Sequence, residues 1–167
     1  MNYNLAIIGG DPAGYDAAAT AAKKGLSVVL FEKSALGGTC LNVGCIPTKT
    51  LLYSSKLYYN AVNGSKYGIK VENPTFEYDK IVSRKNKIIR KLNAGIRSKM
   101  TNNNVTVITG TANVVKNENG IITILCGETE YTAEKLLVCT GSKVAIPPIP
   151  GVDTASYWTS TEALETK

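Results

Sequence analysis

Two cysteines separated by four residues are the most chemically informative feature of the sequence. Cys40 and Cys45 lie within residues 37–49, which read GGTCLNVGCIPTK. In a regular α-helix, this separation places the two Cα atoms about 8–9 Å apart, whereas a disulfide requires about 5.5–6 Å. A disulfide between them therefore requires an irregular backbone. Gly44 permits unusual dihedral angles, and Pro47 loosens the same turn because it lacks an amide hydrogen.

Such a pair is suited to thiol–disulfide exchange. Strained or short-loop disulfides are typically the labile ones, and a helix N-terminus favours the thiolate form of a nearby cysteine. A helix can run from this point to Asn63, and Lys49 adds positive charge one turn after Cys45. The alternatives are a structural disulfide and two unpaired buried thiols. The glycines and the Ile-Pro-Thr-Lys sequence around the cysteines favour the redox interpretation.

The first 32 residues contain the pattern that would position a nucleotide. An apolar strand at residues 5–8 is followed by a glycine-rich turn, an Ala-rich helix over 13–24 and a second apolar strand over 27–31. Glu32 ends this unit, 18 residues after the last glycine of the turn. Strand, glycine turn, helix, strand and acid form the first unit of a dinucleotide-binding fold, which holds a pyrophosphate at the helix N-terminus. The alternative is a generic strand–helix turn.

The glycine-rich turn departs from the usual G-x-G-x-x-G pattern at one position. Residues 9–14 read GGDPAG, so Asp11 replaces the second glycine. A carboxylate about 4 Å from a phosphate costs about 1 kcal/mol in water and several kcal/mol at a lower effective dielectric. We therefore expect weakened dinucleotide binding. Alternatively, the Asp11 carboxylate caps the helix and points away from the ligand.

The rest of the chain predicts an α/β fold. A basic amphipathic helix over residues 78–104 precedes a third parallel strand. The expected strands that follow the helix are 105–108 (parallel), 112–116, 121–125 and 130–132 (short, antiparallel) and 135–139 (buried). We expect a Rossmann-like domain with a parallel sheet, helices on both of its faces and a small antiparallel β appendage.

Composition excludes several classes of protein. The 167 residues are 44% hydrophobic, which suits one globular domain. The net charge of +6 is concentrated in the basic helix, which we interpret as a solvated face and not as a nucleic-acid site. No charged leader or membrane-length apolar run is present, so we expect a cytoplasmic protein without a membrane partner. The spacing of Cys126 and Cys139 does not match common zinc sites, so we expect no metal.

The pattern from about Leu5 to Leu164 resembles the flavin-dependent pyridine nucleotide-disulfide oxidoreductases. Residues 41–49, LNVGCIPTK, are most similar to the dihydrolipoamide dehydrogenases. Glutathione and mercuric reductases usually carry Val where Leu41 and Ile46 stand. The resemblance implies a Rossmann-like FAD-binding domain, of which residues 1–146 are the N-terminal part. Residues 147–167 would be a linker and a short segment leading to an NAD domain that is missing here.

The resemblance also implies roles for individual residues. Cys40 would attack the substrate, Cys45 would lie nearest the flavin, and Lys49 would tune the flavin ring. The residues that would contact FAD are Gly9, Gly14, Glu32, Lys33, Gly38, Thr39, Lys49, Thr140, Gly141 and Ser142. The sequence contains no His, so the His-Glu acid–base pair of the family is not in this chain.

By resemblance, the full-length parent would oxidise dihydrolipoamide to lipoamide and pass the electrons through FAD to NAD+. Its partners would be the dihydrolipoyl groups of 2-oxoacid dehydrogenase or glycine cleavage complexes. We expect the chain to be truncated, to self-associate and to be inactive in NAD-linked turnover. The alternatives are a relative of glutathione or mercuric reductase and a non-catalytic nucleotide-binding or interaction module.

Overall fold

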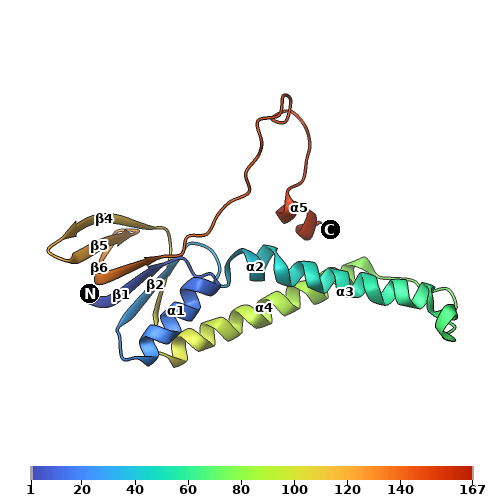
Figure 1. The fold of residues 1–167 in the computed structure, drawn as a ribbon, viewed down its shortest axis with the longest axis horizontal. Helices are drawn as coiled ribbons and strands as arrows, with labels where there is room; N and C mark the ends of the chain where they lie inside the picture. Colours follow the sequence, from blue (N-terminus) through green and yellow to red (C-terminus); the bar gives the residue numbers. More distant parts are fainter. Residues whose placement is uncertain (1, 167) are drawn as a thin grey trace. The chain divides into compact units, whose positions relative to one another are not determined.

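The computed structural model describes residues 2–166, which form two compact units. The first unit contains the residues up to Thr39 together with Leu92–Ala145, and the second contains Cys40–Lys91 together with the residues from Ile146 onward. Figure 1 shows the elements of both units, which are described one at a time below.

One six-stranded sheet forms the framework of the first unit. Its spatial order is β3-β2-β1-β6-β5-β4. The strands are β1 (Asn2–Ile8), β2 (Val28–Glu32), β3 (Thr106–Thr109), β4 (Ala112–Glu118), β5 (Ile121–Cys126) and β6 (Thr129–Val138). The strand β1 is parallel to β2 and β6, and β2 is parallel to β3, whereas β5 is antiparallel to β4 and β6. The α/β class is confirmed, and so are the three predicted parallel strands, which correspond to β1, β2 and β3.

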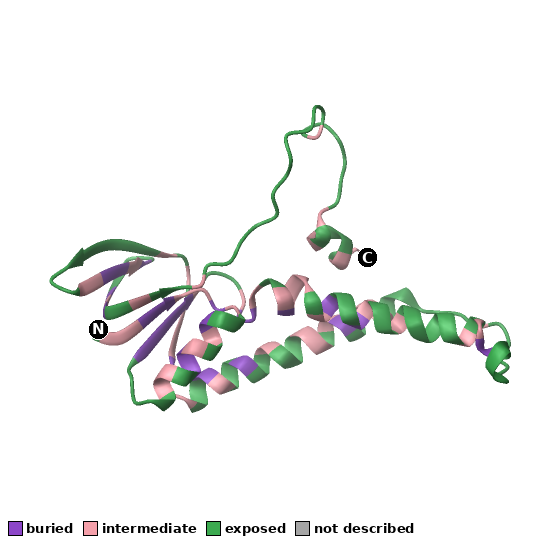
Figure 2. Ribbon diagram, viewed as in Figure 1, coloured by how far each residue is buried: buried purple, intermediate pink, exposed green. Residues whose placement is uncertain are grey.

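The helix α1 (Pro12–Lys23) packs against β1 and β2. Its sequence explains its limits, because Pro12 occupies the first turn, where no amide hydrogen is needed, and Gly25 follows the last turn with a φ of +86°. Ala18 and Ala19 are buried on its inner side, so the helix backbone can approach the sheet closely. Figure 2 shows this burial along α1, β1 and β2.

The antiparallel part of the sheet, which consists of β4, β5 and the first half of β6, covers one face of the parallel part. Phe31 on β2 contacts Tyr131 on β6 edge to face, with ring centroids 5.1 Å apart, although β1 lies between these strands in the sheet order. The sheet must therefore curl so that its antiparallel part folds over its parallel part. Ala6 and Ile124 belong to the same buried cluster. The expected appendage is thus an integral wall of the hydrophobic core.

A single strand, β6, replaces two predicted strands. Residues 130–132 and 135–139 were predicted to be separate, but Thr129–Val138 is continuous, pairing first with β5 and then with β1. The prediction that its second half is buried was also wrong, because Leu137 is 37% and Val138 is 61% exposed. An apolar run fits both a buried strand and an exposed one, so hydrophobicity alone did not distinguish them.

The second unit is built mainly from helices. Its elements are α3 (Cys45–Val62), the 3-10 helix η1 (Gly64–Tyr67), the first part of α4 (Tyr78–Asn102) and α5 (Ser160–Glu165), and α2 (Gly38–Val43) crosses from the first unit into it. The predicted long helix after the redox cysteines and the basic amphipathic helix are both confirmed. None of the helices described between residues 2 and 166 is both long enough and apolar enough to cross a bilayer.

A buried lysine holds the C-terminal helix of the second unit. Lys85 on α4 is 4% exposed, and its Nζ donates a hydrogen bond to the backbone carbonyl of Leu164 at 2.5 Å. Nearby, the Tyr78 hydroxyl donates to the carbonyl of Thr166 at 3.1 Å. A cation at a helix C-terminus also interacts favourably with the helix dipole. Lys85 therefore fixes the end of α5 to α4.

The substitution Lys85→Met is expected to loosen α5 while preserving most of the packing of α4. A hydrogen bond to a charged group contributes about 1.5–3 kcal/mol. Amide hydrogen exchange at residues 160–166 should therefore become at least about tenfold faster. Hydrogen-exchange mass spectrometry would measure this, with Lys87→Met on an exposed position of α4 as the control. Unchanged exchange in the Lys85 variant would show that packing alone holds α5.

Candidate functional site

The predicted nucleotide-binding turns meet at one edge of the parallel sheet. Ile8 pairs with Val138 in parallel register, so the segments that leave β1 and β6 emerge side by side. The amide of Gly9 donates to Phe31 at 2.8 Å, and the amide of Cys139 donates to Ile8 at 2.7 Å. Ligands of open α/β folds bind at this carboxyl edge of the strands, and the first unit therefore presents a nucleotide-site geometry there.

Two glycines allow the turn and α1 to pack tightly against neighbouring backbone. Gly9 has a φ of +108°, and a Cβ atom there would lie 1.9 Å from the carbonyl oxygen of Cys139. A Cβ atom on Gly14 would lie 1.9 Å from the carbonyl oxygen of Gly9. No other residue fits at either position. These are the contacts required of the first and third glycines of a dinucleotide-binding turn.

Glu32 is held over the glycine turn by hydrogen bonds to both of its carboxylate oxygens. Oε2 accepts from the amide of Gly10 at 2.8 Å, and Oε1 accepts from the amide of Ser34 at 2.8 Å and from its hydroxyl at 3.2 Å. Each carboxylate oxygen has two lone pairs, so acceptor capacity remains for a ribose hydroxyl. Gly10 and Ser34 were not among the predicted site residues, because their role is to orient Glu32.

Asp11 caps α1. Its Oδ1 accepts a hydrogen bond from the amide of Gly14 at 2.9 Å, which is the standard role of an N-cap carboxylate. The alternative that the Asp11 carboxylate caps the helix is therefore confirmed. The cap occupies one of the amide groups that an anion would otherwise use at the helix N-terminus. Gly38 packs against the same residue, since a Cβ on Gly38 would lie 2.6 Å from the Cβ of Asp11.

The remaining predicted FAD-contacting residues of the first unit lie on exposed segments. Lys33 directly follows β2, Thr39 lies in α2, and Thr140 to Ser142 follow β6 without regular secondary structure. Gly141 has a φ of +67°, a conformation that suits glycine. Their order along the chain places Lys33 and Thr140 at the carboxyl ends of their strands. Their contacts with FAD stay predictions.

The thiol of Cys139 lies beside this turn, and both its partial burial and the charge of Asp11 in the turn affect its pKa. Partial burial raises its pKa above the ordinary value, and the negative charge of Asp11 raises it further. The folded chain thus disfavours the Cys139 thiolate. The contribution of Cys139 to the free energy of unfolding is therefore fully present below the ordinary thiol pKa, and it is lost as the pH rises through the raised pKa of the folded state. Cys126, the other free cysteine, is buried.

The substitution Asp11→Asn is expected to shift the alkylation of Cys139 to lower pH. Asn retains the N-cap hydrogen bond but removes the charge, so at a given alkaline pH the thiolate fraction and the iodoacetamide rate should rise severalfold. The measurement is the pH profile of alkylation at Cys139, followed by peptide mass spectrometry. Asp16→Asn is the matched control, because Asp16 lies on the same helix but forms an ion pair with Lys99. An equal shift in both variants would contradict the assignment.

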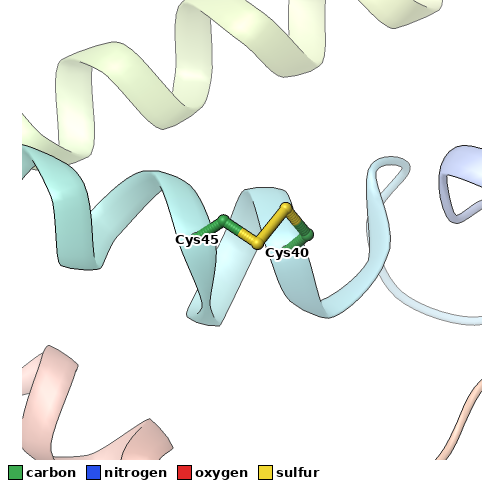
Figure 3. The surroundings of a disulfide bond; sticks show 2 residues. All are labelled: Cys40 and Cys45. Carbon is green, nitrogen blue, oxygen red and sulfur yellow. A yellow bond between two sulfur atoms is a disulfide. The ribbon is translucent and has the colours of Figure 1, made fainter.

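The second unit carries a disulfide between Cys40 and Cys45 (Figure 3). The helix α2 ends at Val43, Gly44 breaks the helix with φ −145° and ψ −111°, and α3 begins at Cys45. This break brings the two cysteine Cα atoms to 4.6 Å, which confirms the expected irregular backbone. Pro47 lies in the first turn of α3, where a missing amide hydrogen leaves no helical bond unmade. The expectation that Pro47 loosens this turn was therefore wrong, and the break lies at Gly44.

The two cysteines differ in exposure. Cys45 is exposed at the N-terminus of α3, whereas Cys40 is partly buried in α2. Lys49 is exposed one turn further along α3. The free amides at the start of an 18-residue helix favour a thiolate at Cys45 after reduction. Exposure alone does not favour Cys40 as the attacking thiol, and that assignment stays a prediction.

The first unit fits one part of a dinucleotide better than the other. Gly9, Gly14 and Glu32 provide the close turn and the acid that suit an adenosine ribose. At the pyrophosphate position the fit is poorer, because Asp11 brings a carboxylate and already occupies the Gly14 amide. Within residues 2–166, no group of three or more His, Cys, Asp or Glu side chains is arranged to hold a metal ion.

A nucleotide-type α/β turn together with a short-loop disulfide defines a class of protein, the disulfide oxidoreductases that use a dinucleotide cofactor. Comparison with known sequences agrees, since residues 3–167 match the family described as pyridine nucleotide-disulphide oxidoreductase. The chain belongs to this family.

Individual relatives share substantial identity with the chain. The dihydrolipoyl dehydrogenase of Zymomonas mobilis is 35% identical over 98% of this chain and 35% of the relative, and that of Acholeplasma laidlawii is 39% identical over 92% and 45%, respectively. The HOCl-induced flavoprotein disulfide reductase RclA of Escherichia coli has a similar structure, with a TM-score of 0.77 and 32% identity over 98% of this chain and 34% of RclA. The chain thus spans about a third to just under half of these relatives.

Proposed function

We propose that this chain supplies the redox disulfide and part of the FAD site of a dihydrolipoyl dehydrogenase. The observation that carries the proposal is the disulfide between Cys40 and Cys45 at the break between α2 and α3, within a chain that matches dihydrolipoyl dehydrogenases over nearly its whole length. The substrates would be dihydrolipoyl groups of 2-oxoacid dehydrogenase or glycine cleavage complexes.

The chemistry of this chain would be a two-step disulfide exchange. One thiolate of dihydrolipoamide attacks a sulfur of the disulfide, which forms a mixed disulfide and releases the other cysteine as a thiolate. The second substrate thiol then attacks the mixed disulfide, so that lipoamide leaves and both Cys40 and Cys45 are reduced. Two electrons and two protons pass from the substrate to the cysteine pair. FAD, when bound, supplies the acceptor for this electron pair, and NAD+ is the final oxidant in the whole enzyme.

Thiol counting after treatment with dihydrolipoamide tests the proposal. The chain has four cysteines, two of which are in the disulfide, so alkylation in denaturant should label two thiols before treatment and four afterwards. Release of one lipoamide per chain should accompany the change. Reduction by glutathione at an equal rate, or no reduction by dihydrolipoamide, would refute the substrate assignment.

A second candidate is a nucleotide-binding or interaction module without catalytic activity. The N-cap bond from Asp11 to the Gly14 amide favours the interaction module, because that bond opposes pyrophosphate binding. Flavin retention and disulfide reactivity together separate the two candidates. After incubation with FAD and desalting, a bound and shifted flavin spectrum together with a disulfide that dihydrolipoamide reduces supports the first candidate, and an unreactive disulfide, with or without bound flavin, supports the second.

We also expect the chain to self-associate. Large apolar side chains are exposed along α3, where Leu52 is 62% and Tyr59 is 59% exposed, and these residues lie seven positions apart on one helical stripe. Apolar patches of this kind are typical of interaction surfaces. Sedimentation velocity should show concentration-dependent oligomers, and the double substitution Leu52→Glu and Tyr59→Glu should shift the chain to monomer. A wild-type monomer at all concentrations would contradict the expectation.

A further inference from the structure

The first half of α4 presents a continuous row of positive charge to solvent. Lys80, Arg84, Lys87 and Lys91 are all exposed and follow one another at intervals of four, three and four residues. This spacing places them on one face of the helix, over a length of about 16 Å at about 1.5 Å per residue. We call these four residues the basic stripe. All four belong to the second unit, which also carries the disulfide.

The basic stripe works against the stability of its own helix. Like charges four residues apart on a helix repel one another, and cations near a helix N-terminus oppose the helix dipole. Solvated helix faces usually alternate acids and bases, but Asp79 is the sole acid within α4, and the next acid along the chain is Glu118. The arrangement is thus unfavourable for an isolated helix, and a negatively charged partner would reverse the effect.

The second unit neutralises little of this charge. Lys80 pairs with Glu77 at 2.7 Å, but both side chains are largely exposed, so the pair is weak. The guanidinium of Arg84 lies over the ring of Tyr53 at 5.7 Å, which orients it without compensating its charge. Among the described residues, no ion pair involves Lys87 or Lys91. The stripe therefore keeps a positive potential for a partner.

The surroundings of the stripe favour an acidic protein over other polyanions. The apolar residues Ile81, Val82 and Ile88 on the first half of α4 are partly buried, so they leave little of the free apolar surface by which amphipathic helices enter membranes. Single-stranded nucleic acids require aromatic platforms interleaved with the charges. Tyr53 lies beside the stripe, but the Arg84 guanidinium already lies over its ring, so that face of the ring is not free to stack on a base. A row of carboxylates on a partner protein needs only matching charge, which the stripe provides.

We propose that the basic stripe docks an acidic protein surface that carries the dithiol substrate to the disulfide. The inference rests on the proposed function, because it assigns the carrier of that substrate. Complementary charge accelerates the encounter and orients the partner more than it strengthens the final complex. A carrier that must leave after each exchange is suited to such weak, fast and salt-sensitive docking.

The test compares two variants of equal net charge. In the stripe variant, Lys80, Arg84, Lys87 and Lys91 become Gln, and in the control variant four exposed lysines elsewhere become Gln, namely Lys23, Lys24, Lys116 and Lys143. The probe is a fluorescein-labelled peptide of alternating Glu and Ala, with binding followed by anisotropy at low and physiological salt. The stripe variant should bind roughly tenfold more weakly than the wild type, and the control should change less than about twofold.

Three outcomes would overturn the inference. The first is an equal loss of peptide binding in both variants, which would indicate general attraction by net charge. The others are stripe-dependent binding of single-stranded DNA, or of vesicles that contain phosphatidylserine, more tightly than of the acidic peptide. Reduction of the disulfide by free dihydrolipoamide is measured in parallel and should be the same in all variants. Failure of that reduction refutes the proposed function, whereas failure of peptide binding alone refutes only the docking surface.

Discussion

Replacing either cysteine of the disulfide by serine is expected to abolish two-electron reduction of the chain by dihydrolipoamide. The exchange needs a disulfide to attack and a cysteine thiolate to leave, and neither Cys40→Ser nor Cys45→Ser retains both. The effect should be complete, because no other cysteine of the described chain forms a disulfide. Lipoamide release should fall to the background of the reagents.

The measurement is alkylation in denaturant followed by mass spectrometry, before and after treatment with dihydrolipoamide. Each single variant has three thiols at the outset, since removing one of four cysteines also frees its partner, and the number should not change. Cys139→Ser is the matched control, because Cys139 is free and lies in the other unit, and it should still gain two thiols. A gain of thiols in a Cys40 or Cys45 variant would refute the assigned disulfide chemistry.

The same variants test which cysteine meets the substrate. The resemblance assigns attack to Cys40, whereas Cys45 is the more exposed of the two in this chain. With an excess of oxidised lipoamide, the variant that retains the attacking cysteine should form the mixed disulfide faster. Faster trapping in Cys45→Ser than in Cys40→Ser would support Cys40, and the reverse order would reassign the role to Cys45.

The local parts of both sites could be predicted from the sequence. The need for a break between Cys40 and Cys45 follows from helix geometry alone, and the structure provides it at Gly44. The turn that begins at Gly9 and the position of Glu32 follow from the spacing of glycines and acid in a βαβ unit. These features depend on residues close together in the chain, so their pattern is visible without the tertiary structure.

The parts that could not be predicted depend on contacts between distant residues. The curl of the sheet rests on the packing of Phe31 against Tyr131, 100 positions away, and no local pattern encodes that pair. The burial of Lys85 could not be predicted either. In the sequence, Lys85 looks like any other basic residue of α4, but it is buried and bonds the distant carbonyl of Leu164. The sequence showed that Asp11 was unusual, yet only the structure shows that it bonds the Gly14 amide.

Removing the charge of Asp11 is expected to strengthen FAD binding by the first unit. A carboxylate about 4 Å from a phosphate costs about 1 kcal/mol in water and about 4 kcal/mol at the effective dielectric of a protein surface. Asp11→Asn should therefore raise the affinity for FAD at least about fivefold. Asp11→Gly should raise it further, because it also frees the Gly14 amide and lets the pyrophosphate approach the backbone.

Titration of the three chains with FAD, followed by flavin fluorescence, gives the affinities. The order of affinity should be Gly above Asn above Asp, and thermal unfolding without FAD would show that capping is not the cause, since Asn and Gly at an N-cap change stability by only a few tenths of a kcal/mol. The advantage over the wild type should shrink as salt rises, because screening weakens the repulsion that the variants remove. Equal affinities in all three chains would mean that the Asp11 carboxylate, held by the Gly14 amide, does not face the phosphates, and that the turn accepts an acid at its second glycine position without cost.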